Sequence, residues 1–168
     1  MYTGVRSDGF TMIELVVTMI IIGILAVSIL PRFDSLGSFD AAGFADQTQS
    51  LLRYAQKSAI AQRRWVAVDV GATPPTLCSQ TVFPTCAAAC AGGTGVTPIA
   101  LPGGSAARPR ASTSFKAGSS TVLCFDALGR PLAAGSAVPL TVAASLTVME
   151  GAADFRTITV EPETGYVH

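Results

Sequence analysis

The hydrophobic and polar residues of this chain form three successive patterns, and the first is a long apolar run near the N-terminus. Apolar character begins at Phe10, and no charged residue occurs from Leu15 to Pro31. About 20 apolar residues are enough for a helix to cross a bilayer core of roughly 30 Å. Because Ile, Val, Leu and Met occupy every side of such a helix, we expect it to lie in lipid or among similar helices. The pattern predicts a transmembrane helix over residues 10–31.

The second pattern has the period of an amphipathic helix and extends over residues 32–64. Pro31 cannot donate its backbone N–H, so we expect a kink between the two helical sections. Asp40 is the expected N-cap of the second section, which runs to about Arg63. Its apolar positions recur at helical spacing and are Phe44, Thr48, Leu51, Leu52, Ala55 and Ala59. We expect this stripe to pack onto the chain's own globular domain.

After residue 64 the hydrophobic period changes to that of β-strands. Residues 65–70 alternate in character, and turn signals at residues 126–129 and 161–165 predict two hairpins, the second of which returns residues 166–168 as a short strand. Further strands are expected at 112–116, 121–125, 140–142, 146–150 and 156–160. One long helix followed by short strands predicts an α+β fold, with the helix laid across an antiparallel sheet.

Residues 71–110 are rich in Ala, Gly, Pro, Thr and Ser, which predicts mostly loop with short strands. This loop holds Cys78, Cys86 and Cys90, and the fourth cysteine is Cys124. Four cysteines beyond a membrane segment indicate an oxidising compartment and up to two disulfides, whose three possible pairings remain open. A segment poor in bulky core residues gains most from cross-links, so stapling is favoured over a partner-binding role for this loop.

Length and charge exclude several classes of function. The 168 residues leave room for one compact domain plus an extended segment, and the 11 basic and 11 acidic residues give no electrostatic reason to expect nucleic acid. The cysteine spacing lacks the paired C-x2-C of zinc sites, so we expect no metal. The one histidine is His168, and the carboxylates near turns do not pair for acid–base chemistry, so we expect neither catalysis nor a cofactor.

Glu14 is the exception within the apolar run. An ionised carboxylate costs about 2.5–3.5 kcal/mol near the centre of a bilayer and less near its edge, and such residues usually have a partner. We expect that partner to be a cation at the same depth on a neighbouring molecule. A secretory signal cleaved after Ala26-Val27-Ser28 remains an alternative, although this run is longer than an ordinary signal and contains Glu14.

The residues around this carboxylate, Asp8-Gly9-Phe10-Thr11-Met12-Ile13-Glu14-Leu15, resemble the prepilin cleavage motif. The resemblance implies that prepilin peptidase cuts after Gly9 and that the new N-terminal Phe10 is methylated. Glu14 then takes the fifth mature position, where the family carries its glutamate. The implied organisation is a leader peptide over 1–9, a transmembrane and assembly helix over 10–31, the second half of the helix over 32–64 and a globular head over 65–168.

This processing suggests how the subunits could be held in register. Cleavage exposes an α-amine on Phe10, and methylation leaves its charge in place. In the apolar interior of a filament, the amine of an incoming subunit can meet the Glu14 carboxylate of a neighbour. Because an unpaired charge there is costly and a paired charge much less so, the pair would favour the correct axial register.

The head carries a second resemblance, to minor pilins and pseudopilins of the GspH/FimT type. Three stretches, 52–57, 124–131 and 157–165, are similar to MshC-like proteins of mannose-sensitive haemagglutinin (MSHA) pilus systems. The resemblance implies a pilin-like fold and a minor subunit of a type IV pilus that helps to initiate or cap the filament. A type II secretion pseudopilin of the H type remains the alternative.

The implied location is the bacterial inner membrane, spanned once with the head in the periplasm, and then the filament. The implied partners are prepilin peptidase, the major pilin, other minor pilins or pseudopilins, a platform protein of the inner membrane, and its lipid. Some FimT-like minor pilins bind DNA through a basic C-terminal tail, but residues 165–168 contain no arginine, and Arg108 with Arg110 is a small basic spot. We therefore expect no nucleic acid, and an adhesive or DNA-binding head stays a second hypothesis.

Overall fold

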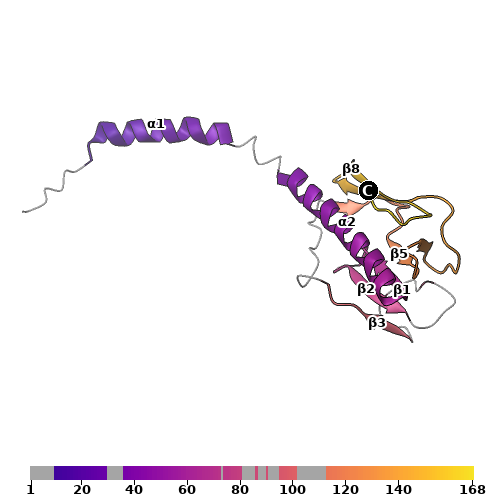
Figure 1. Ribbon diagram of the computed structural model, residues 1–168. Helices are drawn as coiled ribbons and strands as arrows, with labels where there is room; N and C mark the ends of the chain where they lie inside the picture. The colour runs from indigo at the N-terminus through magenta and orange to yellow at the C-terminus, as the bar shows by residue number, and fades with distance from the viewer. Residues whose placement is uncertain are drawn as a thin grey trace, which may run out of the picture. The chain divides into compact units, whose positions relative to one another are not determined.

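A computed structural model describes residues 10–29, 36–72, 74–80, 86, 90, 95–101 and 113–168 (Figure 1). The chain divides into two compact units, Met1–Leu36 and Gly37–His168. The described part of the first unit is dominated by the helix α1, Met12–Ile29. The second unit is the head, which contains almost all of α2, Leu36–Gln62, and all the strands. Gly9, Pro31 and the loop arginines Arg108 and Arg110 lie outside the described residues.

Helix α1 is built from the apolar run, and its large side chains are exposed around the whole helix. Among the residues that the structure describes, no helix combines the length and hydropathy needed to cross a membrane. The membrane-spanning role of residues 10–31 therefore stays a prediction.

Helix α2 buries the apolar stripe expected from the sequence, including Phe44, Leu52 and Ala59. It begins at Leu36, however, so Asp40 lies inside the helix and the expected N-cap is wrong. A cap contributes only about 1 kcal/mol, whereas the residues after Asp40 are already held in the core, with Ala41 completely buried. Capping by Asp40 therefore does not set the start of α2, which is at Leu36.

The strands of the head form two antiparallel sheets. The larger has the order β3-β2-β1-β5-β6, and the smaller has the order β4-β7-β8. The bounds are Trp65–Asp69 for β1, Thr76–Gln80 for β2, Val96–Pro98 for β3, Thr113–Phe115 for β4, Val122–Phe125 for β5, Pro131–Ala133 for β6, Ala144–Glu150 for β7 and Ala153–Val160 for β8. The α+β prediction and the antiparallel pairing are confirmed.

Some details of the strands differ from the sequence-based expectation. Residues 140–142 form no strand, and residues 166–168, expected as a short strand, form only an isolated bridge from Val167 to Val160. The returning strand of the hairpin expected at 126–129 is β6, whose bounds were not predicted. Leu140 donates its N–H to the carbonyl of Pro131, and Pro139 forms a single bridge with Leu132. Because Pro139 has no N–H to give, a longer ladder beside β6 cannot form there.

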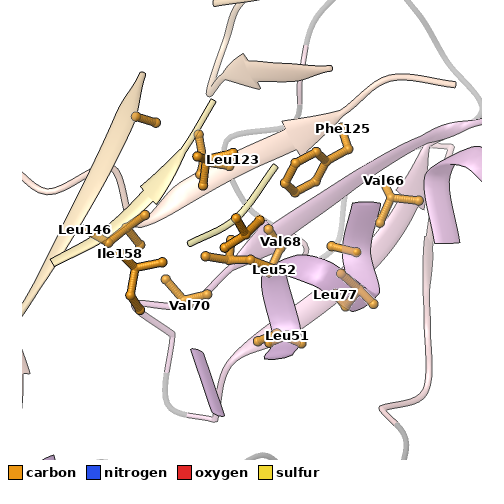
Figure 2. Close-up of a cluster of buried hydrophobic side chains, with 14 of the residues drawn as sticks. Leu51, Leu52, Val66, Val68, Val70, Leu77, Leu123, Phe125, Leu146 and Ile158 are labelled. Carbon is orange, nitrogen blue, oxygen red and sulfur yellow. The ribbon is translucent and has the colours of Figure 1, made fainter. Parts of the chain in front are cut away.

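The main core lies between α2 and the sheets (Figure 2). On β1, Val66 and Val68 point into this core with Leu52 from α2 and Leu123 and Phe125 from β5, and β7 and β8 add Leu146 and Ile158, among others. Each large side chain buried in this way stabilises the fold by about 1.5–3 kcal/mol. The pattern at 65–70 therefore places one face of β1 under the helix, as expected of alternating strand residues.

The opposite face of the larger sheet carries a second, smaller core built around the cysteines. Cys78 bonds to Cys90, and Cys86 bonds to Cys124. These residues cluster with Ala67 and Leu132. The pairing that the sequence left open thus attaches the 81–95 segment to β2 and β5 at two points. The disulfides fill a sheet face that has few bulky side chains of its own.

Candidate assembly site

The start of α1 is held by residues of the cleavage motif itself. The Glu14 backbone N–H donates to the Thr11 hydroxyl oxygen at 3.3 Å, and the Leu15 N–H donates to the Thr11 carbonyl at 3.2 Å. Thr11 is therefore the N-cap, with Glu14 at the third helical position, which is the spacing of a capping box. A carboxylate in the first turn also interacts favourably with the helix dipole. Sequence reasoning missed Thr11, although the T-x-x-E pattern was the signal that could have found it.

Beyond its first turn, α1 presents an apolar surface with few polar groups that need hydrogen-bond partners. Phe10 is 85% exposed and Met12 is 87% exposed, and the other large apolar side chains up to Leu25 are also open. The Thr18 hydroxyl donates to the Leu15 carbonyl at 2.9 Å, so this hydroxyl needs no partner outside the helix. The sequence of α1 contains one charged residue, Glu14. The helix is suited to an apolar environment with a single ionic contact near its N-terminus.

Residues from three stretches of the head, 52–57, 124–131 and 157–165, meet at one junction. The Arg53 guanidinium donates to the Val167 carbonyl through Nε at 3.1 Å and Nη2 at 2.8 Å. The Gln56 amide donates to the carbonyls of Gly129 at 3.2 Å and Thr164 at 2.7 Å. Two polar side chains of α2 thus hold both hairpin turns. We call Arg53, Gln56, Gly129, Thr164 and Gly165 the turn junction.

The turn that contributes Gly129 is closed by Asp126. One carboxylate oxygen of Asp126 accepts from the N–H groups of Leu128 at 2.9 Å and Arg130 at 2.8 Å, and the other accepts from the Arg130 guanidinium. The carboxylate is buried but fully partnered, since Arg130 also forms a salt bridge with it at 2.8 Å. Asp126 is therefore occupied in shaping the turn.

Two further carboxylates near turns, those of Asp154 and Glu161, also have partners. Asp154 meets Lys116 at 2.5 Å, and Glu161 meets His168 at 3.1 Å. Within the described part of the chain, no three His, Cys, Asp or Glu side chains gather as they would to hold a metal ion. A cleft of about 440 Å³ is lined by Ser, Thr and apolar residues, namely Ser120–Leu123, Ala133, Ala134, Leu140 and Val142–Ala144. None of these places combines the groups that catalysis requires.

Two family models match this chain. Residues 5–30 match the family model of the prokaryotic N-terminal methylation motif, and residues 45–164 match the model of type II transport protein GspH. The chain is similar to the crystal structure of the type IV minor pilin FimU from Pseudomonas aeruginosa strain PAO1, with 17% identity and a TM-score of 0.47 over 74% of this chain and 84% of that chain. A search of curated proteins finds no match.

Proposed function

Because the chain belongs to the type II transport protein GspH family, we propose that it is a minor pilin of an MSHA-type pilus, assembled through its N-terminal helix. The family consists of structural pilins and pseudopilins, so its members act by assembly. The observation that carries the proposal is the exposed apolar surface of α1 with one carboxylate, Glu14. Such a surface requires lipid before assembly and other apolar helices afterwards.

In this proposal, prepilin peptidase cleaves after Gly9 and Phe10 is methylated. The match of residues 5–30 to the N-terminal methylation motif supports both steps. Residues 10–31 then anchor the chain once in the inner membrane with its head in the periplasm. A platform protein of that membrane and the other pilins take up the subunit, and the major pilin extends the filament.

We further propose that Glu14 has two roles. Its place in the capping box stabilises the start of α1, and both a glutamate and a glutamine serve that role. Its charge pairs with the amine of Phe10 on a neighbouring subunit, which a glutamine cannot do in the same way. An ionic pair in an apolar interior strongly penalises any register that leaves one charge without a partner.

Two substitutions separate these roles. Glu14→Gln keeps the capping box and removes the charge, whereas Glu14→Ala removes both. We expect both variants to insert in the membrane and to enter filaments at least about tenfold less than the unaltered chain, as expected when one partner of a buried charge pair is lost. Immunoblots of sheared filaments and of membranes measure the two pools. Normal incorporation of Glu14→Gln alone would assign Glu14 to capping and remove the register role.

The second candidate is an H-type pseudopilin of a type II secretion system, which is favoured by the GspH match across most of the head. The two candidates predict different losses when the chain is deleted from its cell. If the chain is a pilus subunit, its deletion leaves secretion intact and removes surface filaments. If it is a pseudopilin, its deletion leaves surface filaments intact and stops the secretion of exported enzymes. Restoring the chain should reverse whichever loss occurs.

A further inference from the structure

The C-terminal end of α2 carries an exposed patch that the core of the head does not use. Ile60 is 47% exposed, and Leu128 in the β5–β6 turn is 73% exposed. A Cβ placed on Gly129 would lie 2.8 Å from Cδ1 of Ile60, so Ile60 lies directly against the residue next to Leu128. Ile60, at the end of α2, and Leu128, in the β5–β6 turn that Ile60 contacts, are therefore both exposed in one region of the head.

The end of α2 that carries Ile60 is rich in cations. Between Asp46 and Asp69 the chain carries Arg53, Lys57, Arg63 and Arg64 and no acidic residue. Arg53 is engaged with the Val167 carbonyl, whereas the other three cations are exposed and form no ion pair within the described residues. We call Lys57, Ile60, Arg63, Arg64 and Leu128 the helix-end patch. The zero net charge of the whole chain conceals this local excess of positive charge.

Interaction with the helix dipole favours cations at this end of α2, but it does not explain the backbone at Arg63. Arg63 has a φ of 51°, and it is the one non-glycine residue with positive φ in the described chain. Its N–H bonds to the Ile60 carbonyl at 3.3 Å, and the Arg64 N–H bonds to the Ala59 carbonyl at 3.2 Å, which is a Schellman end. Glycine fits this position without strain. An arginine held there keeps its side chain at a conformational cost, and residues held at such a cost cluster at functional sites.

We propose that the helix-end patch binds the head of an adjoining filament subunit, through a surface on that subunit with acidic side chains around a small apolar centre. The proposal rests on the proposed function as a filament subunit. An apolar centre inside a charged rim is the usual arrangement of a protein interface. Nucleic acid fits less well, because three cations neutralise few phosphates and aliphatic side chains do not stack on bases.

Site-specific photo-cross-linking in the native cell tests the patch with the full chain. A photoreactive phenylalanine replaces Leu128 in one variant and Val142 in the matched control, since Val142 is 70% exposed and lies outside the patch. We expect position 128 to cross-link to another protein that has a methylated, processed N-terminus, and position 142 to do so several-fold less. Lys57→Glu with Arg64→Glu should lower the yield at position 128 by at least about fivefold, because like charges would then face each other.

The outcomes separate the patch from the proposed function. Purified unaltered and doubly reversed chains should unfold at the same temperature, so that a lower yield reports the interface. If this protein itself, recovered from the cell, lacks a processed N-terminus, both the proposed function and the patch are overturned. A processed chain whose cross-links are equal at both positions, or are unchanged by charge reversal, overturns the patch alone. If the protein binds a fluorescent DNA duplex and loses this binding on charge reversal, the patch binds nucleic acid, and the proposed protein interface is overturned.

Discussion

At the scale of single residues, the turn junction depends on glycines that leave no room for a side chain. Gly165 has a φ of 64°, and a Cβ there would lie 2.0 Å from the Gly129 carbonyl oxygen and 2.6 Å from the Gln56 amide nitrogen. Two constraints therefore act at one position, since the backbone conformation disfavours any side chain and the neighbouring backbone blocks it.

These constraints predict how two glycine substitutions differ. Gly135 has a similar φ of 75°, but no atom lies within 4 Å of a Cβ placed there. Gly135→Ala should therefore lower the free energy of unfolding only by the strain of an alanine in the left-handed conformation, about 1–2 kcal/mol. Gly165→Ala should cost roughly 1–3 kcal/mol more, because the clash adds an overpacking penalty. Urea unfolding of the two variants measures the difference, and equal losses would show that the turn junction can relax.

Arg63 gives the opposite prediction at the same scale. Replacing it with glycine removes the strain of positive φ, while glycine adds flexibility to the unfolded chain. The balance should raise the free energy of unfolding by roughly 0.5–1 kcal/mol. Thermal and urea unfolding of Arg63→Gly checks this value. A clear loss of stability would mean that the Arg63 side chain stabilises the head itself, which would weaken the case that it is kept for binding.

At the scale of elements, the two disulfides differ in how much chain they enclose. Cys78–Cys90 joins residues 12 apart, whereas Cys86–Cys124 joins residues 38 apart. In the chain-entropy view, the longer loop constrains the unfolded state more, by about 1 kcal/mol in a total of roughly 3–4 kcal/mol per bond. Cys86 and Cys124 are also completely buried, whereas Cys90 is partly exposed.

Removing the bonds one at a time tests this ranking. The Cys86→Ala/Cys124→Ala pair should lower the free energy of unfolding by about 1 kcal/mol more than the Cys78→Ala/Cys90→Ala pair does. Denaturant unfolding of both double variants under oxidising conditions measures the losses, and peptide mapping of the unaltered protein checks the pairing. A greater loss from the Cys78→Ala/Cys90→Ala pair would show that the 81–95 segment depends chiefly on its link to β2.

The elements also show which parts of the fold the sequence could predict. Periodicity identified the buried face of α2 and most strands, because a stripe at helical spacing and an alternating strand each leave a direct mark in the sequence. The hairpin at 126–129 was predicted but the bounds of its returning strand β6 were not, since the three residues Pro131–Ala133 are too few to show a period. The start of α2 was misjudged at Asp40, because a residue type that favours caps also occurs inside helices, and α2 begins at Leu36.

At the scale of the whole molecule, the chain consists of an apolar helix, which we propose mediates assembly, and a head, which carries the turn junction and the helix-end patch. The cleavage motif could be found from sequence because its residues are contiguous, and so could the carboxylate at Glu14. The turn junction and the helix-end patch could not, because they bring together residues such as Gln56, Leu128 and Thr164 that only the folded chain makes neighbours. The pairing of the cysteines was undetermined for the same reason.

The account as a whole depends on processing after Gly9, since this cleavage supplies the Phe10 amine that we propose as the partner of Glu14. The most direct measurement is the intact mass and N-terminal sequence of the protein recovered from membranes, in cells with and without prepilin peptidase. The account predicts a chain that begins at methylated Phe10 and appears only when the peptidase is present. A chain that begins at Ile29, whether or not the peptidase is present, would identify an ordinary secreted protein and contradict the filament mechanism.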